Sequence, residues 1–91
     1  MNRITRTQWA VLHASITRQA YELAEKYNLH GAEKSIRVKI RSCVEETFGC
    51  GGVRELSVED FDTALVWVDN WEDTDYLRRY LERQASRRPK A

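Results

Sequence analysis

Apolar residues recur every three or four positions between residues 9 and 27, and this periodicity constrains the fold more than any other feature of the chain. It predicts an amphipathic helix with one apolar stripe, made of Trp9, Leu12, Ile16, Ala20, Leu23, Ala24 and Tyr27. Thr5 and Gln8 have capping-box spacing, and Ile4 and Trp9 have the spacing of a hydrophobic staple, so we expect the helix to begin near residue 6. Asn28 to Gly31 predicts its end, because Asn and Gly tolerate left-handed backbone.

Three further helices are expected, at about 32–48, 58–71 and 75–87. The second has an apolar stripe and a natural stop at Gly49, although Ile36, Val38 and Ile40 also alternate as in a strand. Ser57 is expected to begin the third helix with Asp60 at the box position, and Thr74 to cap the fourth. Between the second and third helices, residues 49–56 predict a glycine-rich loop or a short extended segment.

The chain has 91 residues, which is enough for one domain with one modest core. We therefore expect an all-α protein, a small bundle of three or four helices forming a single domain over 1–91. Pro89 is expected to close the last helix and to leave a frayed tail.

Charge is distributed unevenly along the chain, although the net charge is only +1. Residues 1–48 carry a balance of +3, residues 49–76 a balance of −7, and residues 77–91 a balance of +5. No global field therefore favours nucleic acid or membrane, and any charged interaction must be local.

Catalysis is the function class that the residues support least. His13 and His30 lack a nucleophile and an orienting partner at any recognisable spacing, and we expect both to be structural. Cys43 is expected in the core, whereas Cys50, between glycines, is expected to be exposed and open to reaction or to pairing between chains. No metal-ligand, calcium-loop or phosphate-loop pattern occurs, so we expect no metal and no cofactor. The lack of a membrane-spanning run and of a signal-peptide core predicts a cytoplasmic protein.

Two surfaces are candidates for binding. The first is an acidic and aromatic face, expected to contact a protein partner or to form a homodimer, comprising Trp67, Trp71, Asp69, Glu72, Asp73 and Asp75. The second is a basic surface suited to phosphates, formed by a stripe on the second helix and by the Arg-rich fourth helix: Lys34, Arg37, Arg41, Arg78, Arg79 and Arg83. A solvated helix face or a core tryptophan would explain either pattern without any binding.

The order of motifs resembles the C-terminal module of bacteriophage antirepressor and related regulatory proteins (the ORF-six C-terminal type). The resemblance covers roughly residues 4–71 and is carried by Ile4-Thr5-Arg6-Thr7-Gln8, by Phe48-Gly49, and by the segment from Leu56 to Trp67 that follows the pattern L-S-x-E-x-F-x-x-A-L-x-W. It implies a phage or prophage regulatory protein in a bacterial host cell. The acidic segment 69–75 and the Arg-rich end depart from that pattern.

Two hypotheses follow for function. The first is a free-standing, non-enzymatic phage inhibitor or antirepressor that blocks a protein or nucleoprotein partner, such as a host defence complex. The alternative is a sequence-tolerant nucleic-acid-binding regulator that uses the basic helix 34–41 and the Arg-rich last helix.

Overall fold

The computed structural model describes residues 2–87, and the side chains of residues 2–83. Four α-helices follow one another: α1 (Arg6–Lys26), α2 (Glu33–Phe48), α3 (Phe61–Asp69) and α4 (Thr74–Arg87). Two short 3₁₀ helices, η1 (Val53–Glu55) and η2 (Val58–Asp60), connect α2 to α3. The all-α class is therefore confirmed, and no strand occurs among the described residues. The expected frayed tail after Arg87 lies outside them.

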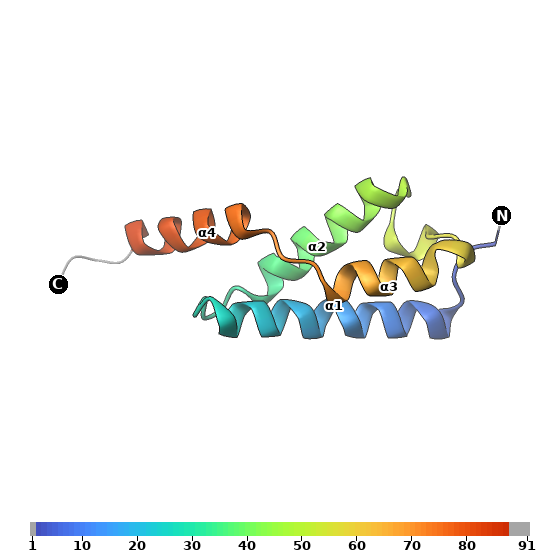
Figure 1. Cartoon of the computed structure of the whole chain (residues 1–91), viewed down its shortest axis with the longest axis horizontal. Coiled ribbons are helices and arrows are strands. Elements are labelled where there is room, and N and C mark those ends of the chain that lie inside the picture. Colours follow the sequence, from blue (N-terminus) through green and yellow to red (C-terminus); the bar gives the residue numbers. More distant parts are fainter. Residues whose placement is uncertain (1, 88–91) are drawn as a thin grey trace.

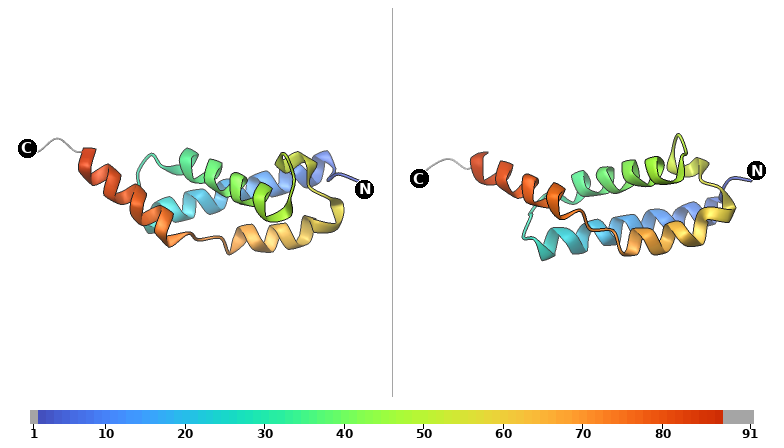
Figure 2. Two further views of the ribbon diagram at one scale, coloured as in Figure 1. Left: turned by 90° about the horizontal axis from the view of Figure 1, so that it is seen from above. Right: turned by 45° about the horizontal axis from the view of Figure 1, so that its top comes forward.

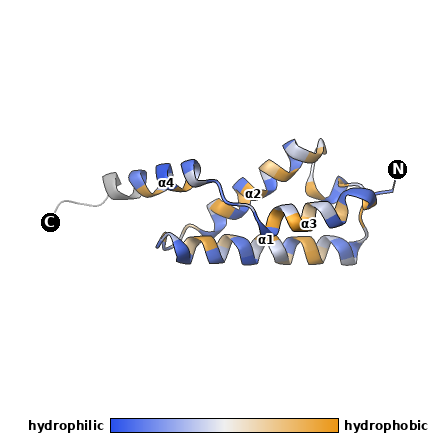
Figure 3. Cartoon of the chain, in the orientation of Figure 1, coloured by the Kyte–Doolittle hydropathy of each residue, from blue (hydrophilic) through white to orange (hydrophobic). Residues whose placement is uncertain are grey.

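Helix α1 is the element against which the others are arranged. Both α2 and α3 pack along it, and α4 projects beyond one end of this three-helix body (Figures 1 and 2). Hydrophobic and hydrophilic residues alternate along α1 and α2, as one-sided burial requires, while α3 is mostly hydrophobic (Figure 3). The completely buried large side chains come from every helix and from the 3₁₀ segment: Leu12, Ile16, Ile36, Ile40, Val44, Leu56, Val68 and Leu77.

The predicted signals at the ends of α1 and α2 are present. The Thr5 hydroxyl accepts a hydrogen bond from the Gln8 backbone N–H (3.1 Å), and the Gln8 side chain accepts one from the Thr5 N–H (2.9 Å). Asn28 has φ 55° after α1, and Gly49 has φ 66° at the end of α2, so both take the left-handed conformation. These ends depend on neighbouring residues only, which is why sequence alone predicts them.

The predicted start of the third helix is wrong in detail. Ser57 does not form a capping box with Asp60; its hydroxyl accepts from the Glu59 N–H (3.2 Å), and this starts the 3₁₀ turn η2 instead of an α-helix. The α-helix begins only at Phe61 and ends at Asp69, two residues before the expected limit. Residues 49–56 form a loop with a 3₁₀ turn, because Val53 and Leu56 turn inward to the core.

The connection from α3 to α4 is fixed by hydrogen bonds rather than left free. The Gln19 side chain donates to the Trp71 carbonyl oxygen (2.7 Å), which holds this segment against α1. Asp73, and not Thr74, caps α4, since its carboxylate accepts from the Tyr76 backbone N–H (3.0 Å). Leu77 is completely buried, and the Tyr76 hydroxyl donates to the Ser35 carbonyl oxygen (3.5 Å), so the first turn of α4 is attached to α2.

Two valines on α3 provide a test of this packing. Val68 is completely buried and Val66 is 64% exposed. We expect Val68→Ala to lower the free energy of unfolding by about 2–3 kcal/mol, since it removes buried methyl groups and leaves a cavity. Val66→Ala should change it by less than about 0.5 kcal/mol. Urea denaturation followed by circular dichroism measures both, and equal effects would contradict the position of α3.

Candidate nucleic-acid interface

The two tryptophans of the expected acidic and aromatic face are not free contact residues. Trp71 is only 7% exposed and belongs to the core. Trp67 is partly buried and packs edge-on against Phe48, with ring centroids 6.2 Å apart. Their spacing of one helical turn predicts that both rings lie on one face of a helix. Helix α3 ends at Asp69, however, so Trp67 is in the helix and Trp71 follows it.

The acids of that face have partners within the chain. Asp69 forms an ion pair with Arg18 (3.0 Å), Glu72 with Lys26 (2.9 Å), and Asp75 with Arg78 (3.3 Å). Glu72 also accepts a hydrogen bond from the Tyr27 hydroxyl, while Asp73 is the cap of α4. The contacts of Asp69 and Glu72 reach α1 over 45 to 51 residues of sequence, so no local pattern could predict them.

The basic stripe of α2 has a different environment. Lys34 and Arg41 are exposed and Arg37 is partly buried, and the three line a hollow of about 150 Å³ between α1 and α2 together with His13, Ile16 and Val38. Within the described part of the chain, no carboxylate lies within ion-pair distance of any of the three cations. The stripe is therefore a set of positive charges beside a hollow, with no ion pair among the described residues.

A second group of cations and rings lies around another hollow, nearer the start of α1. The Trp9 and His13 rings stack with centroids 4.9 Å apart and planes inclined by 12°. The Arg54 guanidinium lies over the Trp9 ring, 4.4 Å from its centroid. Arg54 and Trp9 line a hollow of about 490 Å³ with Ile4, Thr5 and Arg6.

The loop before α3 holds Arg54 in this position. Val53 and Leu56 on either side of it are buried, so Arg54 and Glu55 between them face outward. The Ile4 N–H donates to the Leu56 carbonyl oxygen (2.9 Å), and the Val58 N–H donates to the Asn2 carbonyl oxygen (3.0 Å). These two bonds attach η1 to the N-terminal segment and set the guanidinium over α1.

His13 joins the two hollows, because it stacks on Trp9 and also lines the hollow beside the stripe. We call the combined surface the basic groove; its members are Arg6, Trp9, His13, Lys34, Arg37, Arg41 and Arg54. The sequence-based prediction found only the three residues of α2. The four-residue spacing of Trp9 and His13 on one helix was a signal for their stack, whereas nothing near Arg54 in sequence indicates its position.

The arginines of α4 are not part of this groove. Arg78, Arg79 and Arg83 are exposed, and Arg78 is paired with Asp75. Helix α4 contacts α2 through Tyr76, whose ring lies under the Lys39 ammonium and whose hydroxyl reaches Ser35. At 100° per residue, Ser35 and Lys39 are on the opposite flank of α2 from Lys34 and Arg41. The predicted basic surface is thus divided between two flanks.

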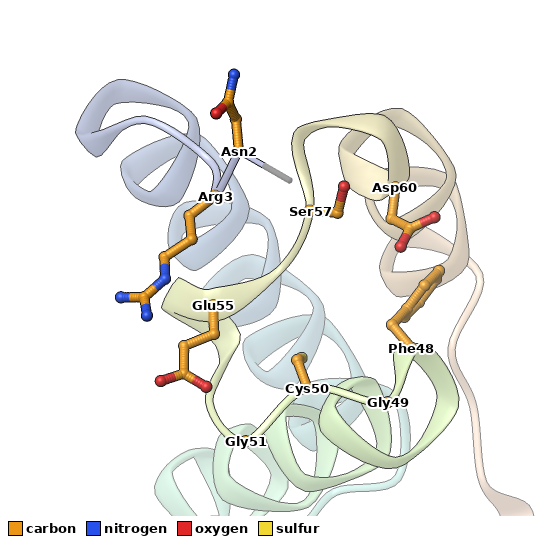
Figure 4. Close-up of a pocket in the computed structure, with 9 residues that line it drawn as sticks. All are labelled: Asn2, Arg3, Phe48, Gly49, Cys50, Gly51, Glu55, Ser57 and Asp60. Carbon is orange, nitrogen blue, oxygen red and sulfur yellow. The ribbon is translucent and has the colours of Figure 1, made fainter.

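Cys50 is less exposed than expected. It lines a separate hollow of about 380 Å³, formed by residues 2–3, the turn at 48–51, and Glu55, Ser57 and Asp60 (Figure 4). Burial, and then the negative charge of Glu45, raises the pKa of the Cys50 thiol. A higher pKa lowers the thiolate fraction. The side chain is only partly exposed, so the expected full exposure of Cys50 is wrong.

Comparison of the chain with protein-family models, with curated proteins and with solved structures finds no match. The resemblance to the phage antirepressor module accordingly stays a prediction. Among the described helices, none is both long and apolar enough to cross a membrane.

The cluster around Glu72 predicts a specific pH dependence of stability. The hydrogen bond from Tyr27, and then the one from Lys26, lowers the pKa of the Glu72 carboxyl below its usual value. The folded protein therefore binds a proton at this group less readily than the unfolded chain. The stability from Glu72 is present above the unfolded pKa of about 4.3 and is lost as the pH falls through the lower folded pKa.

We expect Glu72→Gln to flatten the fall in melting temperature on acidification below about pH 4.5, where the unfolded carboxyl begins to titrate. Glu59→Gln, an exposed carboxyl outside the described ion pairs, is the matched control. Thermal denaturation from pH 2 to 7 measures the effect. An acid limb as steep in Glu72→Gln as in the control would contradict the assigned cluster.

Proposed function

We propose that the protein is a non-enzymatic regulator that binds nucleic acid along the basic groove. The observation that carries the proposal is the set of cations without an ion-pair partner among the described residues, which flank a stacked Trp–His pair. Clustered like charges oppose folding. Phosphates are the natural counter-charge, and each phosphate contact releases condensed counterions.

The dimensions of the groove agree with a short segment of backbone. From Lys34 to Arg41 the stripe extends about 10 Å, at 1.5 Å per residue. Three cations over this length can contact successive phosphates of one strand. Arg6 and Arg54 extend the row beyond Trp9.

The protein-blocking hypothesis has less support, because the residues on which it depended are engaged inside the chain. Trp71 is buried, Asp73 caps α4, and Asp69 and Glu72 hold the segment after α3 to α1. A surface charge already paired within the chain must give up its partner before it can bind another. The unpaired cations of the basic groove have no such cost.

Two triple variants test the location of binding. Lys34/Arg37/Arg41→Glu and Arg78/Arg79/Arg83→Glu change the net charge equally, so a difference between them reports position rather than total charge. We expect the first to reduce affinity for a labelled 12-nucleotide strand at least 100-fold and to reduce the salt slope of log K by about 2–3. The second should retain affinity within about fivefold.

Fluorescence anisotropy from 25 to 200 mM salt measures both variants and the unaltered protein. Equal losses in the two variants would assign binding to the overall charge or to α4. No binding by the unaltered protein at 25 mM salt would remove the nucleic-acid function altogether.

A protein partner remains a second candidate, on the observation that Val66 is the most exposed large hydrophobic residue described, at 64%. Asp62, which is exposed, lies on the same face of α3, four residues before Val66. An apolar side chain beside a carboxylate suits a partner whose apolar pocket has a basic rim.

Val66→Asp tests this second candidate. We expect it to abolish co-purification of any bacterial partner that the unaltered protein captures, while Lys34/Arg37/Arg41→Glu keeps it. A partner captured equally by both variants would contradict a binding site on α3.

A further inference from the structure

We infer, building on the proposed function, that the nucleic acid recognised is single-stranded and that one unpaired base sits in the hollow bounded by Arg6, Trp9 and Arg54. The hollow holds about 490 Å³ and opens beside the stacked Trp9 and His13 rings. Pockets for small organic ligands begin at about 300 Å³, so a base fits this volume.

The shape of the groove argues against a duplex. Proteins that read duplex DNA present a protruding helix or ribbon to a major groove about 12 Å wide. Here His13 and Arg37 line a hollow between α1 and α2, the Trp9 ring lies under Arg54, and all three of the side chains His13, Arg37 and Trp9 are only partly exposed. The bases of a duplex are stacked on one another inside the helix, so their faces cannot reach a recessed ring. A single strand can turn a base inward.

The chemistry of the hollow matches the face of a base. Unpaired bases stack on aromatic rings and on arginine guanidinium planes. The Arg54 guanidinium lies 4.4 Å from the centre of the Trp9 ring, and His13 stacks on the same ring at 4.9 Å. Because the Trp9 ring already contacts both His13 and Arg54, an inserted base would stack on the guanidinium plane of Arg54, and Arg6 at the rim supplies a cation for its phosphate.

The rest of the strand then has a defined course. His13 also lines the hollow that contains Arg41, Arg37 and Lys34. A strand with one base beside Trp9 can therefore pass His13 and lay its following phosphates along the α2 stripe. Such a site contacts the flat face of a base, which all four bases have, so we expect little sequence preference.

A comparison of three nucleic acids of equal length separates stacking from phosphate binding. The probes are a labelled 12-nucleotide single strand, the same strand with every base removed to leave abasic sites, and the corresponding duplex. We expect the intact strand to bind about 5- to 150-fold more tightly than the abasic strand, which is the range for stacking of one base, and more tightly than the duplex.

Substitutions then place the stacking in the hollow. Arg54→Lys keeps the charge and removes the guanidinium plane, and Trp9→Leu removes the ring. Both should reduce the ratio of intact to abasic affinity toward one. Arg79→Lys on α4, the same exchange at an exposed site outside the groove, should leave the ratio unchanged. Because Arg54 is exposed, its variant decides the question even where Trp9→Leu fails to fold.

Each outcome decides the inference. A higher affinity for the intact strand that is lost in Arg54→Lys and kept in Arg79→Lys supports base seating. Equal affinities for intact and abasic strands, duplex binding as tight as the single strand, or an undiminished ratio in Arg54→Lys would overturn it while leaving phosphate binding in place. Failure of all three probes to bind would overturn the proposed function as well.

Discussion

Helix α1 packs against α2 on one flank and against α3 on the other, and these two contacts hold the three-helix body together. Its buried stripe includes Leu12, Ile16 and Ala20, each at most 1% exposed. Because α1 packs against a different helix on each flank, the two flanks carry different polar side chains. The α3 flank carries Gln19, Arg18 and Lys26, which hold the chain after α3 through the Trp71 carbonyl, Asp69 and Glu72. The α2 flank carries His13, and Trp9 lies one turn before it under the Arg54 guanidinium. The cations around these two rings have no ion-pair partner among the described residues. The cations on the α3 flank are thus paired with carboxylates, and the basic groove lies on the side where the cations have no ion pair among the described residues.

We therefore place the nucleic-acid hypothesis ahead of the protein-blocking one. The acidic segment 69–75 stood out in the sequence because its charges are close together, but most of them serve the fold: Asp73 caps α4, and Asp69 and Glu72 tether the segment to α1. Exposed ion pairs of this kind add little stability; their effect is to fix the path of the chain between two helices. Lys34, Arg37 and Arg41 of α2 are less dense in sequence and form no ion pair among the described residues. Lack of an internal partner, more than density of charge, indicates a surface available for binding.

What could be predicted from sequence was local. The capping box of Thr5 and Gln8, the left-handed stops at Asn28 and Gly49, and the buried stripes of α1 and α2 depend on residues within a turn or two of one another. The predicted start of the third helix was too early, because Ser is a common N-cap residue of α-helices. Ser57 instead caps a 3₁₀ turn, and Leu56 before it is buried in the core. The burial of Trp71, and the placement of Arg54 over Trp9, result from contacts between segments some 45 to 52 residues apart. No periodicity carries that information. For the candidate site, the sequence therefore predicted the basic stripe of α2 but not the stack of Trp9, His13 and Arg54.

The three tryptophans can report directly whether a single strand binds in the basic groove. Trp9 lies in the basic groove, Trp67 against Phe48, and Trp71 in the core. Each indole N–H gives a separate signal in a ¹⁵N-correlated NMR spectrum, and a short single strand can be titrated into the labelled protein. If the strand binds in the basic groove, we expect the Trp9 indole signal and the backbone amide signals of residues 34–41 to shift together and to saturate with one affinity. The Trp67 and Trp71 signals should stay in place. Shifts confined to Trp67 and α4, or a spectrum unchanged at millimolar strand, would contradict the assignment of the groove as the binding surface.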